Sequence, residues 1–325
     1  MTSDSFSDDI KDLRHQIDDA LKSIVTMSEP AYLYDPVHYV LSGRGKRLRP
    51  ILVFLVGRLF NVSTLKLMPA ALSVELLHNF SLVHDDIMDR DDTRHGQPTV
   101  HKKWDESTAI LAGDAIFTLV YHQLIQLDSH QQTCMSVVNE ATIKLCEGQA
   151  LDKDYESRKN VTILDYLTMV GLKTGALLSL CCQLGAILGK ADEEEILDLK
   201  EFGTLMGQAF QIQDDVLEIF SNQTEMGKSL GSDVLAGKKT YLTCKAMEQD
   251  PDSWHRLVDS LTDADLHSEV LPSLRTYFEE NGIVFEAKSE VYAMMALVKA
   301  KLDRFDVPQK EDIIQFVDMI TARKK

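Results

Sequence analysis

Carboxylates gather in a short cluster whose spacing suits metal chemistry. LVHDDIMD places Asp85, Asp86 and Asp89 at the end of an apolar, helix-compatible segment. At ~100° per residue, Asp85 and Asp89 project the same way one helical turn apart, with Asp86 beside them. Like charges at this spacing destabilise a helix, and a hard cation that prefers oxygen ligands would offset the repulsion. For one such cluster, a solvated acidic helix end is the alternative.

A second cluster repeats the pattern much later in the chain. QIQDDVLE places Asp214, Asp215 and Glu218 at the same offsets on another apolar segment. Two such clusters could face each other across a cavity and hold metal ions between them, so the repetition favours metal binding. Helical projection puts Gln211 and Gly207 beneath the second cluster, where a small residue would leave room for an apolar ligand tail.

Basic residues form short clusters in the sequence that could bind phosphate groups. GRGKRLRP carries Lys46, Arg47 and Arg49 in a Gly-flanked turn before a helix that begins with proline. Guanidinium and ammonium groups fixed in a turn suit a phosphate or diphosphate. Arg94 and His95 follow the first carboxylate cluster directly. A basic surface turn is the alternative for the first piece.

Two further basic pieces lie later in the chain. Lys173 and Thr174 stand within an apolar helical stretch, where the lysine either extends to solvent or meets an anion. Lys228 and Lys238 bracket a Gly-rich loop directly after the second carboxylate cluster. Gly-rich backbone and lysines beside carboxylates that bind metal would form a lid over a phosphate.

The elements that must position these residues are almost all helices. Apolar residues follow three-four spacing from Ile10 to Ile24, which predicts an N-terminal amphipathic helix within 1–30. We expect two helices between 50 and 88 with a break near 61–63. Further helices are predicted at 105–127, 134–150, 163–188, 192–220, 239–249, 283–304 and 309–323. The segments 222–239 and 250–268 are expected to be connections, and no strand pattern or repeat is evident. The sequence predicts one all-α domain over residues 1–325.

The composition of the chain limits the kinds of partner that the protein is expected to bind. The 325 residues hold 34 Lys+Arg against 51 Asp+Glu, a net charge of -17, which argues against nucleic acid or an anionic membrane as partner. The most apolar window, 175–189, is too short to span a bilayer and is predicted to be a buried core helix. We see no signal peptide, and the five cysteines fit a reducing compartment, so we expect a cytoplasmic protein with no integral membrane segment.

The residues together describe a site for a diphosphate that carries a hydrocarbon tail. A divalent metal that bridges carboxylates to the diphosphate would neutralise a leaving group, and an allylic tail could carry the resulting cation. Magnesium is the preferred ion because every ligand is an oxygen. No nucleophilic serine or cysteine arrangement is evident.

The motifs resemble those of the trans-isoprenyl diphosphate synthases, the polyprenyl synthetase family. HDDIMDRDDTRHGQPT is similar to the first aspartate-rich motif of that family and QIQDDVLE to the second. GRGKRLRP resembles the early basic motif and MGKSLGSDVLAGKKT the lysine loop. The motifs stand in family order between about residues 40 and 245. The resemblance implies an isoprenoid synthase fold, with helices around a deep central cavity, and a homodimer.

The resemblance also implies roles for individual residues. Several Mg2+ ions would be bound by Asp85, Asp86, Asp89, Asp214, Asp215 and Glu218. The allylic diphosphate would be held by Arg94, Lys173, Thr174, Gln211, Lys228 and Lys238, with Lys173 and Gln211 also counted as catalytic together with the aspartates. Isopentenyl diphosphate would be held by Lys46, Arg49 and His78, with His95 nearby.

The reaction implied is a condensation of isopentenyl diphosphate with an allylic diphosphate. Phe80 and Ser81, five and four positions before the first aspartate, would influence product length, and C20 is favoured over C15. On an ideal helix, however, Phe80 falls almost opposite the aspartate face. The alternatives are a longer-chain synthase, a terpene cyclase and a non-catalytic subunit of a heteromeric synthase.

Two positions depart from the family pattern. His95 stands where the family usually has a second arginine, so we expect isopentenyl diphosphate to bind more weakly as the pH rises through the titration of this histidine. Glu218 stands where aspartate is commoner. These two departures motivate the subunit alternative.

Overall fold

The computed structural model describes residues 3–43, 45–221, 234, 237–261 and 269–321. The described chain divides into two compact units. The first unit contains residues 1–142, 177–200 and 304–315, and the second contains 143–176, 201–303 and 316–325.

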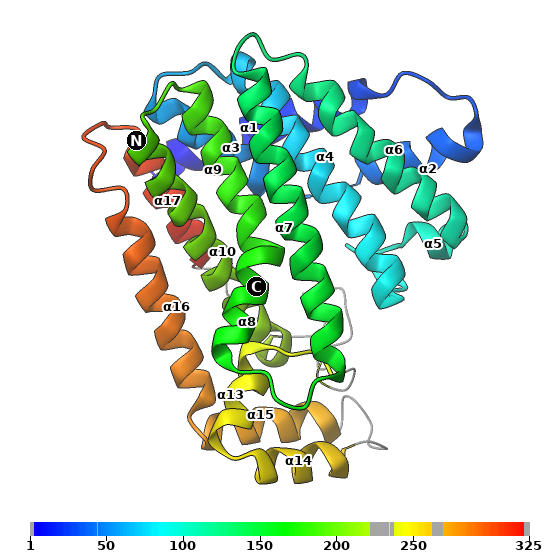
Figure 1. Ribbon diagram of the computed structural model, residues 1–325, viewed down its shortest axis with the longest axis vertical. Coiled ribbons are helices and arrows are strands. Elements are labelled where there is room, and N and C mark those ends of the chain that lie inside the picture. Colours follow the sequence, from blue (N-terminus) through cyan, green and yellow to red (C-terminus); the bar gives the residue numbers. More distant parts are fainter. Residues whose placement is uncertain (1–2, 44, 222–233, 235–236, 262–268, 322–325) are drawn as a thin grey trace. The chain divides into compact units, whose positions relative to one another are not determined.

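The first unit is built on two long helices that pack side by side. These are α4 (Thr64–Asp89) and α6 (Glu106–Leu124), which Figure 1 shows next to each other. α3 (Leu48–Leu59) packs on α4 and is buried around nearly its whole circumference, as expected of a helix that is apolar on every side. The break between α3 and α4, at Asn61 with φ 58°, confirms the predicted break near 61–63.

The N-terminal helix is amphipathic, as predicted. α1 (Ser3–Ile24) buries Ile10, Leu13, Ile17 and Leu21, each at most 3% exposed, against the rest of the first unit. α2 (Ala31–Leu41) is not among the helices predicted from the sequence. Pro30 only precedes this helix, and Pro36 is accommodated inside it and buried. α5 (Val100–Lys103) is a single turn before α6.

In the chain, the second unit begins within α7 (Gln131–Ser157) and continues through α8 (Ile163–Val170), the π-helical turn η1 (Gly171–Gly175) and the start of α9 (Ala176–Leu188). α10 (Glu193–Phe220) carries the second carboxylate cluster, and α13 (Tyr241–Gln249) and α16 (Ile283–Ala300) pack together. α17 (Lys310–Thr321) is the last helix described, and like α7 and α10 it has residues in both units.

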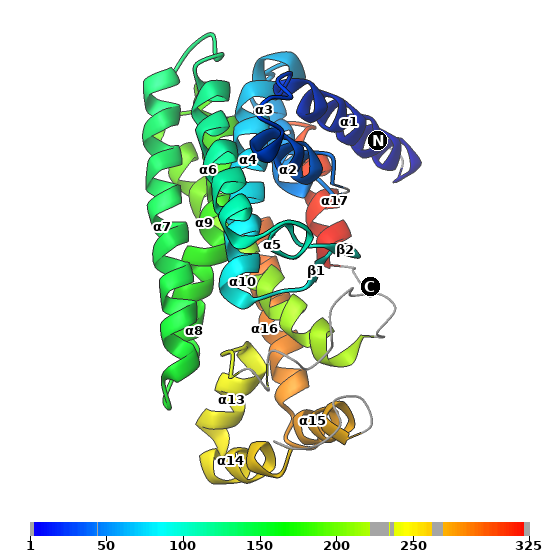
Figure 2. The ribbon, with the colours of Figure 1, turned by 90° about the vertical axis from the view of Figure 1, so that its right-hand side faces the viewer.

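The prediction of a plain connection at 250–268 was wrong for its first half. α14 (Pro251–Ser260) forms there, followed by α15 (Leu271–Glu280). Figure 2 shows both helices at the bottom of the view, with α14 next to α13. Asp250 caps α14 by accepting a hydrogen bond from the Ser253 backbone N–H, and Pro251 takes the first helical position. Trp254 stacks on Phe278 of α15 at 5.6 Å between ring centroids, so one aromatic residue anchors an otherwise polar helix.

One continuous helical run, Ile163–Leu188, is long and apolar enough to cross a membrane by length and composition. Because 78% of its most apolar window is buried inside the protein, this segment fits a core helix, as the sequence predicted.

Candidate active site

The first carboxylate cluster lies at the C-terminal end of α4. The helix ends where Arg90 adopts a left-handed conformation, φ 57°. Asp86 is 5% exposed and accepts a hydrogen bond from Arg94 Nε at 2.5 Å, whereas Asp85 and Asp89 are partly exposed. The three aspartates are therefore not equivalent: the Asp86 carboxylate is directed at an arginine of the same motif.

A tight hairpin places Arg94. β1 (Thr93–Arg94) pairs with β2 (Gln97–Pro98), and the two residues between them have positive φ, 51° at His95 and 76° at Gly96. Two such residues give the turn that matches the natural twist of a hairpin. Strands of two residues leave no periodicity in the sequence, so neither strand was predicted. Arg94 also pairs with Asp91, with Nη2 3.2 Å from Oδ2, so two carboxylates hold its guanidinium.

His78 and Arg49 are brought together by α4 and the start of α3. Arg49 Nη1 lies 3.0 Å from His78 Nε2. Burial, and then the positive charges of Arg49 and Arg94, lower the pKa of His78 well below its usual value. The imidazole is therefore neutral, and its Nε2 accepts the hydrogen bond from Arg49. Lys46 is exposed in the same motif.

His95 lies in the same unit and is exposed. Shielding of its ring by surrounding atoms lowers its pKa, and the charges of Arg94, Arg47 and Lys46 lower it further. The expected weakening of isopentenyl diphosphate binding through neutralisation of His95 therefore belongs to a window below its usual pKa of about 6.5.

The second carboxylate cluster is tied to two other helices of the second unit. Asp215 is 6% exposed and accepts three hydrogen bonds, from Tyr166 Oη at 2.6 Å, the Tyr241 backbone N–H at 2.8 Å and Gln211 Nε2 at 3.1 Å. Burial raises the pKa of Asp215 to about 7, although each of these hydrogen bonds favours the carboxylate. Asp214 and Glu218 lie beside it on α10 and are partly exposed.

Lys173 and Thr174 lie in the π-helical turn η1. Single π-turns inside helices are frequent at functional sites because they redirect side chains. Lys173 Nζ is 2.5 Å from Asp152 Oδ2 on α7, and Thr174 Oγ1 donates to Gln211 Oε1 at 3.1 Å. Asp152 was not singled out from the sequence, because nothing in its local spacing shows that α7 runs beside η1.

Two glycines let the neighbouring helices approach η1. A Cβ at Gly148 of α7 would lie 2.3 Å from the Lys173 backbone nitrogen, and a Cβ at Gly207 of α10 would lie 2.5 Å from the Gly175 Cα. The interpretation of Gly207 as room for a ligand tail was therefore wrong, because the backbone of η1 fills that space.

The lysine loop is only partly described. Lys228 lies outside the described residues, whereas Lys238 and Lys239 precede α13. Lys239 Nζ donates to the Gly237 carbonyl at 2.9 Å, and burial lowers the pKa of this lysine.

The predicted chain-length residues face different surroundings. The Phe80 ring packs between His84, at 4.7 Å, and Phe117 of α6, at 4.9 Å between centroids. Ser81 Oγ instead donates to the backbone carbonyl of His78 at 2.9 Å. Phe80 thus belongs to an aromatic layer between α4 and α6.

The donor set fits magnesium only with oxygens supplied by a substrate. Among the described residues, no three His, Cys, Asp or Glu side chains converge on one point. Asp85 and Asp89 offer carboxylate oxygens one turn apart on α4. Magnesium commonly binds one or two carboxylates together with substrate phosphate oxygens, so an incomplete, all-oxygen set agrees with this ion.

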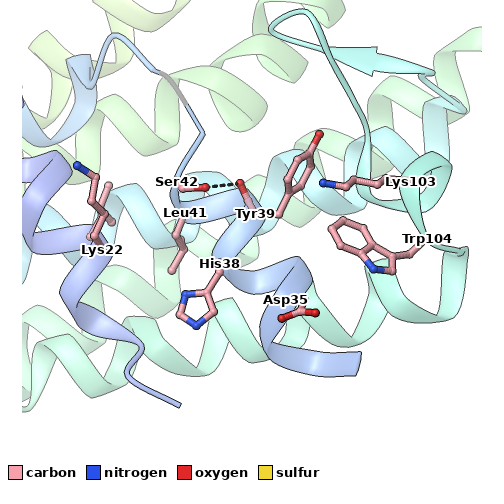
Figure 3. Close-up of a pocket in the computed structure, with 9 residues that line it drawn as sticks. Lys22, Asp35, His38, Tyr39, Leu41, Ser42, Lys103 and Trp104 are labelled. Atoms are coloured by element: carbon pink, nitrogen blue, oxygen red, sulfur yellow. Dashed lines mark hydrogen bonds between the residues drawn. The ribbon is translucent and has the colours of Figure 1, made fainter. Parts of the chain in front are cut away.

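A cavity of about 450 Å³ lies elsewhere in the first unit, among residues of α1, α2 and α5 (Figure 3). Lys103 and Trp104 line one side, and the Lys103 ammonium lies 3.7 Å from the centre of the Tyr39 ring. None of the site residues predicted from the sequence lines this cavity.

Comparison with known proteins agrees with the motifs. Residues 30–277 match the family model described as polyprenyl synthetase. The chain is 36% identical over 321 residues to geranylgeranyl diphosphate synthase of Methanosarcina mazei, covering 98% of each protein. It is 33% identical over 323 residues to geranylfarnesyl diphosphate synthase of Natronomonas pharaonis, covering 93% of each.

Solved structures show the same fold. A crystal structure of a geranylgeranyl pyrophosphate synthase matches with a TM-score of 0.90 and 35% identity, covering 97% of this chain and 99% of that one. The synthetase from Pyrococcus horikoshii matches with a TM-score of 0.89 and 32% identity over the full length of both chains. The predicted all-α isoprenoid synthase fold is confirmed, and the chain belongs to the polyprenyl synthetase family.

Proposed function

We propose that the protein condenses isopentenyl diphosphate with an allylic diphosphate to give a short-chain (E)-prenyl diphosphate, with C20 the favoured product. The observation that carries this proposal is the Arg49–His78 contact in the same unit as the aspartate-rich end of α4. A cyclase needs to hold one diphosphate, whereas this unit offers two groups of residues suited to diphosphate. Relatives named geranylgeranyl diphosphate synthase support C20, and a relative named geranylfarnesyl diphosphate synthase keeps C25 as the neighbouring alternative.

The first unit would hold parts of both substrates. Lys46, Arg49 and His78 would bind isopentenyl diphosphate, with neutral His78 orienting the Arg49 guanidinium. Arg94, held by Asp86, would bind the allylic diphosphate. Asp85 and Asp89 would bind Mg2+, which supplies positive charge to the leaving diphosphate when bound.

The second unit carries the other residues that the family resemblance assigns to the allylic diphosphate. Asp152 fixes the Lys173 ammonium, and Thr174 and Gln211 form a hydrogen-bonded chain that ends on Asp215. Asp214 and Glu218 would bind Mg2+ with Asp215, and Lys228 and Lys238 would contact the diphosphate.

The reaction breaks the bond between C1 and oxygen of the allylic diphosphate, and the diphosphate leaves with the electron pair. The double bond of isopentenyl diphosphate then attacks C1, which forms the new carbon–carbon bond. The attack leaves a cation on the isopentenyl unit. The carbon next to this cation loses a proton to the departing diphosphate, which forms the new double bond, so no nucleophilic side chain is needed. Basic groups held before the substrate arrives stabilise the charge that develops on the leaving group.

A homodimer in the cytoplasm is part of the proposal. α6 and the residue after it leave three large apolar side chains about half exposed, namely Ile110, Leu111 and Ile125. Burial of such residues against a second copy would remove apolar surface from water. Sedimentation velocity of the purified protein measures the assembly.

One assay separates the proposed function from its alternatives. Purified protein is incubated with Mg2+, isopentenyl diphosphate and, separately, C5, C10 and C15 allylic diphosphates, and the products are sized by mass spectrometry. Products that end at C20, and no product with a metal chelator, are expected. Diphosphate release without elongation would indicate a cyclase, longer products a longer-chain synthase, and no turnover a non-catalytic subunit.

A further inference from the structure

Arg47, in the middle of GRGKRLRP, is buried although its neighbours face solvent more openly. It is 6% exposed and adopts a left-handed conformation, φ 52° and ψ 34°, immediately before α3. This conformation is unfavourable for a residue with a side chain, and it persists only where the surroundings enforce it. The side-chain contacts of Arg47 supply that enforcement.

All three guanidinium nitrogens of Arg47 donate hydrogen bonds inside the first unit. Nε donates to Asp18 Oδ1 at 2.8 Å, Nη1 to Glu75 Oε1 at 2.6 Å and Nη2 to the Gly43 carbonyl at 2.6 Å. A Cβ at Gly45 would lie 3.1 Å from Nη1, so a glycine leaves room for the guanidinium. A guanidinium that is satisfied in this way holds protein segments together and is not directed at a substrate.

The segments that Arg47 holds are those that carry the substrate-binding residues. Lys46 precedes it, and Arg49 lies in the first turn of α3, where the Arg47 carbonyl accepts from the Ile51 N–H at 3.2 Å. Glu75 and His78 lie about one turn apart on α4, so one face of α4 fixes Arg47 and then contacts Arg49.

Asp18 brings α1 into this arrangement. It lies before residue 30, where the match to the polyprenyl synthetase model begins. α1 also has a second ion pair with α3, in which Arg58 binds both carboxylate oxygens of Asp9 at 2.5 and 3.1 Å. Two acidic residues therefore attach α1 to the rest of the first unit. Of these two, Asp18 contacts the basic motif and Asp9 does not.

We propose that the Asp18–Arg47–Glu75 bridge positions Lys46 and Arg49 for isopentenyl diphosphate, which makes the N-terminal helix part of the binding site for the second substrate. Asp18, Arg47 and Glu75 are positioning residues that do not touch the substrate. This inference rests on the proposed function, because it presupposes that Lys46 and Arg49 bind isopentenyl diphosphate.

The test compares Asp18→Asn with Asp9→Asn. Each variant removes one charge from an ion pair of α1, and Asp9 is the matched control because its partner Arg58 lies outside the basic motif. Glu75 is not the first choice, since its loss would leave Arg47 buried with less compensation and endanger folding. Steady-state assays measure kcat and the KM of each substrate, and calorimetry measures isopentenyl diphosphate binding without turnover.

We expect Asp18→Asn to raise the KM and Kd for isopentenyl diphosphate roughly tenfold, which corresponds to ~1.4 kcal/mol. The KM of the allylic substrate and kcat at saturation should stay within about twofold, and Asp18→Glu should restore most of the affinity because it keeps the carboxylate. Asp9→Asn should lower the melting temperature without changing either KM.

Equal isopentenyl diphosphate KM values for Asp18→Asn and Asp9→Asn would overturn the inference and leave the proposed function intact. So would an equal rise in both substrate KM values for Asp18→Asn. A wild-type protein that neither turns over nor binds isopentenyl diphosphate would overturn the proposed function, and the inference with it.

Discussion

Gly148→Ala tests whether the close contact between α7 and η1 requires a glycine. The added Cβ would meet the Lys173 nitrogen at 2.3 Å, its Cα at 2.7 Å and the Leu172 carbonyl carbon at 2.8 Å. Heavy atoms in contact normally lie ~3.5–4.0 Å apart, so the overlap is about 1 Å. All three atoms belong to the backbone, so rotation of a side chain cannot relieve the overlap, and η1 must move.

The expected cost follows from two opposing contributions. Overpacking of this kind costs ~1–3 kcal/mol, and the better helix propensity of alanine returns ~1 kcal/mol. We therefore expect Gly148→Ala to lower the free energy of unfolding by up to about 2 kcal/mol. Displacement of Lys173 by about 1 Å should also lower kcat by roughly a hundredfold.

Gly113→Ala is the matched control for stability. Its Cβ would also meet an atom at 2.3 Å, but that atom is His84 Nε2, at the far end of a side chain that is 26% exposed and can rotate. The control should be unchanged or stabilised by up to ~1 kcal/mol. Urea denaturation of both variants measures the difference, and equal stabilities would refute the argument that the backbone of η1 excludes a side chain at residue 148.

Three further predictions concern pH and product length. Since burial raises the pKa of Asp215 to about 7, the folded state holds this proton more tightly than the unfolded state, and its contribution to stability is lost as the pH rises from about 4 to about 7. Without Mg2+, Asp215→Asn should therefore gain stability relative to wild type across that window, by up to ~4 kcal/mol in urea titrations, and a difference independent of pH would contradict the raised pKa. Phe80→Ala removes a ring that packs on Phe117 and should lengthen the products by at least one isoprene unit in mass spectra; unchanged length would show that the ring is not the stop. Because the pKa of His95 is lowered, the isopentenyl diphosphate KM should be flat between pH 7 and 8 and fall below about pH 6.5. His95→Arg should lower this KM about fivefold at pH 7 to 8 and remove its pH dependence, because arginine stays charged; a variant with the wild-type pH profile would exclude His95 as the cause.

The parts of the fold that were predicted correctly are those with local signals. The apolar stripe of α1 and the break between α3 and α4 follow from periodicity and from polar residues at the break. α14 was missed because its single large anchor, Trp254, stands among polar residues and finds its partner on α15. Local composition does not show that contact.

The candidate site likewise has features that local spacing predicts and features that depend on contacts between distant parts of the chain. Spacing identified Asp85, Asp86 and Asp89 as a cluster, but it could not separate Asp86, since that distinction depends on a hairpin that returns Arg94 to it. The close approach of α7 and α10 to the π-turn requires glycines of those two helices, so no pattern within residues 171–175 predicts these contacts. Long-range contacts decide which members of a motif face a ligand and which face the protein.

The internal pairing of Arg47 also changes how an anion would meet this protein. Among the described residues of GRGKRLRP, the three positive charges of Lys46, Arg47 and Arg49 stand beside the two negative charges of Asp18 and Glu75, so the local surplus is small. The whole chain carries a net charge of -17, so an approaching diphosphate meets an overall repulsive field. The basic motif therefore acts at contact distance, and encounter is faster for a diphosphate whose charge is already partly neutralised, as in its complex with magnesium.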